Sequence, residues 1–150
     1  MPDSTLKKTS GRNSVIIRKL KLLEDKLAEI RSWEIHSFYE FQTNTLLRYA
    51  VERILQVCVE IIIDIGMRMI ALEKKLPTEN ASEMLSTLEK MGVISKNNPY
   101  HKMVQFRNFI VHRYEYVDAE ILYGIIKKEL TDFDLFCEEI KKYQSLNNME

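Results

Sequence analysis

Four side chains that could take part in a chemical reaction lie close together in the sequence near the end of a predicted helix: Arg107, Asn108, His112 and Tyr114. Histidine titrates near neutrality, so His112 suits removal of a proton from a ribose hydroxyl. Arg107 offers a planar pair of donors to the negative charge that gathers on a phosphate during cleavage. Asn108 can hydrogen-bond a phosphate or fix the imidazole, and Tyr114 can stack on a base or bond a phosphate oxygen. These residue types suggest RNA cleavage without a metal ion.

The spacing does not place all four groups on one face of a straight helix. Arg107 and His112 are five residues apart, which is ~140° around an ideal helix. Arg107 nearly shares a face with Tyr114, and Asn108 shares one with His112. By spacing alone, an arginine and a histidine near a helix end are more often surface residues. A convergent site therefore needs a loosened helix end at His112, or a second copy of the motif across a two-fold interface.

The composition predicts one globular domain without a strong overall charge. The chain has 150 residues, of which 45% are hydrophobic and 29% are charged, and 22 Lys and Arg balance 22 Asp and Glu. Proteins that hold nucleic acid by bulk electrostatics are usually basic. Any RNA contact is therefore expected to be local, made by a few arginines in a groove.

The sequence predicts a cytoplasmic protein that does not cross a membrane. The most apolar stretch, residues 54–72, is interrupted by Gln56, Glu60, Asp64 and Arg68. The basic start of the chain is not followed by an apolar signal core. Cys58 and Cys137 both lie in apolar helical patterns, so we expect buried free thiols rather than a disulfide, as suits a reducing compartment.

Apolar residues recur with a helical period along most of the chain and predict an all-α, up-and-down helical bundle of four to five main helices. The domain is expected over residues 13–144, between a disordered tail at 1–12 and a polar tail at 145–150. The predicted helices cover residues 15–33, 45–74, 81–91, 100–114 and 119–143. The aromatic stretch 34–44 fits either a short helix or a turn.

The helix predicted over residues 45–74 carries one narrow polar stripe. Its polar residues fall at every fourth position: Arg48, Glu52, Gln56, Glu60, Asp64 and Arg68. Nearly everything between them is apolar, so we expect burial on several sides, by the chain's own bundle and by a second subunit. A solvated face with an ion pair between Asp64 and Arg68 explains the stripe equally well.

The run RNFIVHRY at residues 107–114 resembles the R-x-x-x-x-H-x-Y motif of the HEPN superfamily. Residues 53–64, 91–94, 103–108 and 118–123 are also similar to HepT-type toxins, and the resemblance covers roughly Leu47 to Ile140. It implies a two-fold homodimer whose motifs meet in a cleft. It further implies a metal-independent endoribonuclease that acts as the toxin of a toxin–antitoxin pair and uses no cofactor.

The resemblance also assigns roles to single positions. Arg107 and His112 match the catalytic pair, and Asn108 matches the polar residue beside the arginine. Tyr114 matches the tyrosine to which a partner nucleotidyltransferase, the MNT antitoxin, transfers AMP units from ATP and so silences the toxin. Asp64 matches an acidic position that can face the site, although an ion pair with Arg68 explains it too.

Two further expectations concern metal binding and an alternative function. His36 and His101 show no metal-ligand spacing, so no metal site is expected. A second hypothesis is a non-catalytic HEPN dimer that serves as partner or regulatory subunit of a nucleotidyltransferase. The presence of Arg107, His112 and Tyr114 together favours the ribonuclease, because a pure scaffold would not need all three.

Overall fold

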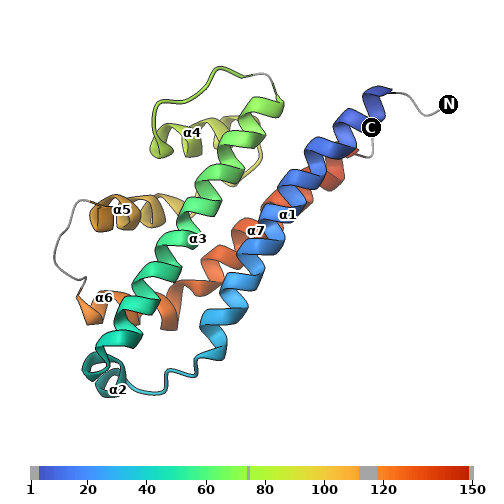
Figure 1. Ribbon diagram of the computed structural model, residues 1–150. Coiled ribbons are helices and arrows are strands. Elements are labelled where there is room, and N and C mark those ends of the chain that lie inside the picture. Colours follow the sequence, from blue (N-terminus) through green and yellow to red (C-terminus); the bar gives the residue numbers. More distant parts are fainter. Residues whose placement is uncertain (1–3, 74, 112–117, 149–150) are drawn as a thin grey trace.

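The computed structural model describes residues 4–73, 75–111 and 118–148, and the regular secondary structure of this part of the chain is helical, without strands (Figure 1). The elements are α1 (Ser4–Ser32), α2 (Phe38–Thr43), α3 (Thr45–Leu72), α4 (Ala81–Met91), α5 (Tyr100–Val111), α6 (Ala119–Gly124), the π-helical segment η1 (Ile125–Glu129) and α7 (Leu130–Asn148). The all-α prediction is confirmed, and residues 38–43 of the aromatic stretch form a short helix.

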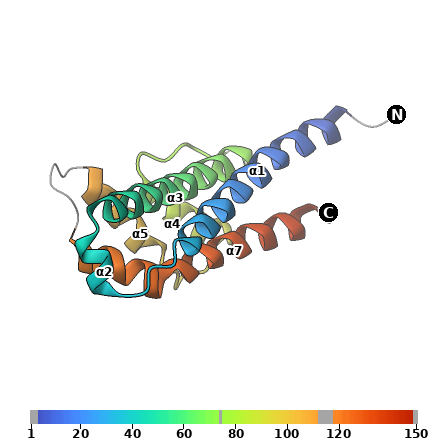
Figure 2. The same ribbon diagram turned by 60° about the horizontal axis from the view of Figure 1, so that its bottom comes forward.

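The three long helices α1, α3 and α7 form the body of the bundle. α1 packs against both α3 and α7, and α1 begins at the same end of the bundle at which α7 finishes (Figures 1 and 2). α4 and α5 pack on α3 and on each other, and α2 and α6 cover the first turns of α3. Because α3 contacts five other helices, its apolar faces are buried, as the narrow polar stripe predicted.

The first helix follows the predicted apolar period, but it starts earlier than expected. Its buried residues are Ile16, Leu20, Leu23, Leu27 and Ile30. α1 begins at Ser4, inside the range predicted as a polar tail, and α7 likewise continues to Asn148 through most of the second predicted tail. Neither segment contains a proline, and Gly11 alone is not enough to end a helix. Residues 1–3 and 149–150 lie outside the described residues.

The helix predicted over residues 119–143 is interrupted by the π-helical segment at Ile125–Glu129. A π-helical turn inserts an extra residue and shifts the phase of the apolar face. Ile121 is 46% exposed, whereas the neighbouring Leu122 is fully buried. Phe133, Phe136 and Ile140 beyond the bulge are buried.

Both cysteines are buried free thiols, as predicted. Burial raises the pKa of the Cys58 thiol to about 12 and that of Cys137 to about 11. Thiols held in the neutral form are poor nucleophiles, so neither cysteine is a candidate for catalysis. No helix among residues 4–73, 75–111 and 118–148 has the length and hydropathy needed to cross a membrane.

Helices α3 and α4 approach closely at Gly66, and this contact generates a stability prediction. A Cβ at Gly66 would lie 2.2 Å from Sδ of Met84, a fully buried side chain that would have to move. We expect Gly66→Ala to lower the free energy of unfolding by about 1–2 kcal/mol, because overpacking outweighs the gain in helix propensity. In a thermal melt Tm should fall by about 2–8 °C.

Gly124→Ala is the matched control, since Gly124 is also helical but has open space where its Cβ would lie. This variant should raise Tm by about 2–4 °C through helix propensity alone. An equal response of the two variants would show that the contact with Met84 does not restrict position 66.

Candidate functional site

The predicted motif begins in the second half of α5. Arg107 and Asn108 lie within this helix, which the structure describes as far as Val111. His112 and Tyr114 lie outside the described residues. The geometry of the site is therefore built from the α5 side chains and from the helices that hold them.

Arg107 lies on the core-facing side of α5. It follows Met103 by four residues and Val104 by three, and both of these side chains are buried. The Arg107 side chain is half-buried, and its Nε is buried without a hydrogen-bond partner among the described residues. A positive charge on this core-facing side of the helix costs free energy of hydration unless an anion offsets the loss. The position is therefore suited to binding a phosphate rather than to packing.

Asn108 is exposed, and its Oδ1 accepts a hydrogen bond from Nη1 of Arg107 at 3.1 Å. The two expected roles for Asn108 were contact with a phosphate and contact with the imidazole. In the structure the amide oxygen instead restricts the orientation of the guanidinium, while the amide nitrogen still has two protons to donate.

Asp64 belongs to the ion-pair alternative rather than to the motif. Its carboxylate pairs with Lys19 of α1 and, at 3.8 Å, with Arg68. Leu55, which faces α5, lies nine residues earlier and therefore ~180° around α3. Asp64 thus faces α1 and points away from the side of α3 on which α5 packs.

The polar residues of α3 on the α5 side are Arg48 and Glu52. Each lies seven residues, about two turns, before a residue that packs toward α5: Leu55 for Arg48, and Val59 for Glu52. Both side chains are half-buried, and Nη2 of Arg48 donates to Oγ1 of Thr45 at 3.4 Å. The sequence placed both residues in the polar stripe, which rotates by ~40° with each step of four residues, but it did not single them out as facing the site.

The first turn of α5 is joined to α7 through Glu139. Tyr100 is fully buried, and its hydroxyl donates to one oxygen of the Glu139 carboxylate. The other oxygen accepts the backbone N–H of Ser95 at 2.7 Å. Burial, and then the neighbouring carboxylate, raises the pKa of Tyr100, so this phenol stays a donor. The Tyr100 ring also meets Phe136 of α7 edge-on, with centroids 5.3 Å apart.

A second glutamate, Glu89, joins the start of α5 to α4. Its Oε1 contacts Nε2 of His101 at 3.0 Å and accepts Nδ2 of Asn98 at 2.8 Å. Asn98 in turn accepts the backbone N–H of Tyr100 at 3.0 Å. The hydrogen bonds from His101 and Asn98 lower the pKa of Glu89, which therefore stays ionised over a wider pH range. His101 thus links the start of α5 to α4.

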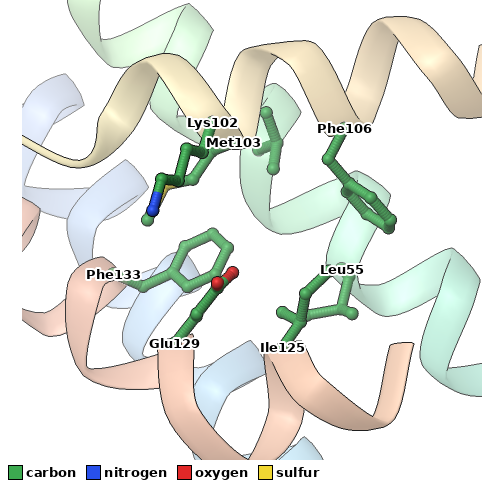
Figure 3. Close-up of a pocket in the computed structure, with 8 residues that line it drawn as sticks. Leu55, Lys102, Met103, Phe106, Ile125, Glu129 and Phe133 are labelled. Atoms are coloured by element: carbon green, nitrogen blue, oxygen red, sulfur yellow. The ribbon is translucent and has the colours of Figure 1, made fainter. Parts of the chain in front are cut away.

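A small apolar pocket, with room for about one water molecule, lies where the middle of α5 meets α3, η1 and α7 (Figure 3). Lys102 and Glu129 reach toward it from α5 and η1, and the rest of the lining is apolar: Leu55, Val59, Met103, Phe106, Ile125 and Phe133. No group of three His, Cys, Asp or Glu residues able to hold a metal occurs in the described part of the chain.

This fold and motif define an all-helical protein of the HEPN class. The chain belongs to the ribonuclease HepT-like family, whose model matches residues 23–140. It is 24% identical over 131 residues to the mRNA nuclease HepT of Shewanella oneidensis, covering 86% of this chain and 98% of that protein.

Two solved structures share the fold. The cytosolic protein of unknown function YutE from Bacillus subtilis superposes with a TM-score of 0.77 at 22% identity, covering 90% of this chain and 92% of YutE. The tri-AMPylated HEPN toxin of Shewanella oneidensis, in complex with the MNT antitoxin, gives a TM-score of 0.76 at 24% identity. That match covers 85% of this chain and 97% of the toxin.

The contacts of Glu89 predict a pH dependence of stability. Its pKa in the folded state is lower than the unfolded value of 4.5, so its contribution is fully present above that value. The contribution is lost as the pH falls through 4.5 toward the folded pKa. Glu89→Gln should lower the free energy of unfolding by on the order of 1 kcal/mol at pH 7. The difference from wild type should shrink on acidification.

Urea unfolding of both proteins between pH 3 and pH 7 measures this difference. A gap between wild type and Glu89→Gln that is constant across the whole range would contradict the assignment of the pH dependence to Glu89.

Proposed function

We propose that this protein is a metal-independent endoribonuclease that acts in the cytoplasm as the toxin of a toxin–antitoxin pair. The observation that carries the proposal is the half-buried Arg107 on the core-facing side of α5, five residues before His112. Membership of a ribonuclease family and likeness to a named mRNA nuclease support it. RNA is the proposed substrate, and the proposal includes no cofactor.

The mechanism follows from the two side chains. His112 in its neutral form takes the proton of a ribose 2′-hydroxyl, and the 2′-oxygen attacks the adjacent phosphorus. Arg107 stabilises the negative charge that develops on the equatorial phosphate oxygens, while Asn108 holds the guanidinium in place. The bond from phosphorus to the 5′-oxygen breaks, and the imidazolium returns the proton to that oxygen. The products are a 2′,3′-cyclic phosphate and a 5′-hydroxyl.

A two-fold homodimer is part of the proposal. Arg107 and His112 are ~140° apart on a regular helix, so one straight helix does not aim both at a single phosphate. A second copy of α5 across a two-fold axis supplies a second pair of these groups to a shared cleft. Phe109, exposed by 41% on the same helix, offers apolar surface for such a contact.

Tyr114 is the proposed off-switch. A partner nucleotidyltransferase of the MNT type would transfer AMP from ATP to its hydroxyl, with release of pyrophosphate. Support comes from the similar fold of a toxin that is described as tri-AMPylated and bound to an MNT antitoxin. Each added AMP brings bulk and a negative phosphate to the position next to His112, where the RNA phosphate must bind.

Cleavage of RNA in the presence of a chelator tests the proposed activity. The purified wild type should cleave RNA in EDTA, whereas His112→Ala and Arg107→Lys should each lose about 10²–10³-fold in rate. His36→Ala is the matched control, because His36 is an exposed histidine far along the chain from the motif. This variant should cleave RNA like the wild type. An intact substrate with the wild-type protein would favour the non-catalytic dimer, and cleavage by His112→Ala would exclude the proposed base.

Mass spectrometry after co-expression with an MNT-type nucleotidyltransferase tests the switch. Trypsin should release residues 114–127, which contain Tyr114, Tyr116 and Tyr123, so fragmentation is needed to locate the adduct. We expect mass increments of AMP units on Tyr114 that disappear in Tyr114→Phe and persist in Tyr116→Phe. Adducts confined to another tyrosine would contradict the assignment.

A further inference from the structure

The buried contact between Tyr100 and Glu139 lies on the same face of α5 as Arg107. The two α5 residues are seven positions apart, which brings their side chains to within ~20° of each other around the helix. Along the axis they are separated by roughly 10 Å. The hydrogen bond of the Tyr100 hydroxyl therefore restrains α5 in the rotation that decides where Arg107 points.

This rotation matters because the guanidinium lies well off the helix axis. At a radius of roughly 6 Å, a turn of the helix by about 20° displaces a side-chain group by roughly 2 Å. Displacements of about 1 Å are enough to reduce the rate of a positioned reaction substantially. A group that fixes the rotation of α5 therefore acts on the reaction without touching the substrate.

The packing between Tyr100 and Arg107 does not fix this rotation by itself. Met103 and Phe106, the apolar residues between them, line a small apolar pocket (Figure 3). The long side chains of Lys102 and Glu129 complete its lining. Apolar packing attracts without a preferred direction, so a directional contact sets the rotation of α5 more sharply than this packing does.

Glu139 is suited to be that restraint because its carboxylate holds two points of the chain at once. One oxygen accepts the Tyr100 hydroxyl, and the other accepts the Ser95 N–H at 2.7 Å. The second anchor, between His101 and Glu89, has side chains that are 43% and 21% exposed. In the first anchor the Tyr100 side chain is fully buried and Glu139 is half-buried, so solvent weakens the Tyr100 contact less.

We propose that Tyr100 and Glu139 are positioning residues for the RNA-cleavage reaction, and that their buried hydrogen bond holds α5 in the rotation that presents Arg107 to the phosphate. This inference rests on the proposed function. It makes Tyr100 and Glu139, two residues distant from the motif, determinants of kcat rather than of substrate binding.

Tyr100→Phe and Tyr143→Phe form a matched pair of variants. The hydroxyl of Tyr143 on α7 also donates to a glutamate, Glu73, at 2.7 Å, but this contact joins α7 to the end of α3. Both substitutions thus delete one phenol that donates to one carboxylate. Rates are compared at a temperature at which circular dichroism shows both variants fully folded.

Tyr100→Phe should lower kcat by about ten-fold or more and leave KM within about two-fold, because a misplaced Arg107 loses its contact with the charge that develops in the transition state. Tyr143→Phe should leave both constants within about two-fold of wild type. The double variant Tyr100→Phe/Glu139→Ala should be no slower than the slower single variant, since both remove the same contact. Wild-type kcat in Tyr100→Phe, or equal losses in the two tyrosine variants, would overturn the inference.

An NMR measurement separates this inference from the proposed function. The Nε–H signal of Arg107, assigned by its loss in Arg107→Lys, should shift in Tyr100→Phe and stay in place in Tyr143→Phe. If the wild type cleaves no RNA, the proposed function fails, yet this shift would still establish that Tyr100 orients Arg107. An Arg107 signal unchanged in Tyr100→Phe would overturn the positioning role whether or not RNA is cleaved.

Discussion

Placing a guanidinium on the core-facing side of α5 is the constraint on which the rest of this site depends. At that angular position the helix otherwise presents buried Met103 and Val104, so Arg107 loses part of its hydration, and its Nε has no hydrogen-bond partner among the residues that the structure describes. The fold compensates with directional contacts. Asn108 orients the guanidinium, and Tyr100 restrains the helix that carries it. A phosphate of a bound RNA would supply the missing negative charge.

The scaffold holds this helix by directional contacts at one end and by apolar packing in the middle. Glu139 and Glu89 hold the start of α5 against α7 and α4, while Met103 and Phe106 line a small apolar pocket shared with α3 and η1. The long helix α3 organises this arrangement, because it contacts α5 on one side and pairs with Lys19 of α1 through Asp64 on the other. One side of α3 therefore supports the helix that carries the site, and the other side packs against α1.

Periodicity was sufficient to predict the helices, because each must bury a continuous apolar stripe, as Ile16, Leu20 and Leu23 do in α1. It could not predict the π-helical turn at Ile125–Glu129, which depends on packing rather than on any local signal and which turns Ile121 outward. The motif identified Arg107 and Asn108 from residue types. The ion pair of Asp64 with Arg68 was predicted, but its pairing with Lys19 and the anchor between Tyr100 and Glu139 could not be, because they join residues far apart in the chain.

The central claim is that Arg107 and His112 promote attack of a ribose 2′-hydroxyl on the neighbouring phosphate without a metal ion. The most direct measurement is the chemical identity of the RNA ends produced in EDTA, determined by mass spectrometry of a short defined oligonucleotide. The proposed chemistry predicts fragments with a 2′,3′-cyclic phosphate, or the monophosphate formed by its opening, paired with a 5′-hydroxyl. Fragments carrying a 3′-hydroxyl and a 5′-phosphate would contradict it, because those ends require attack by water rather than by the ribose.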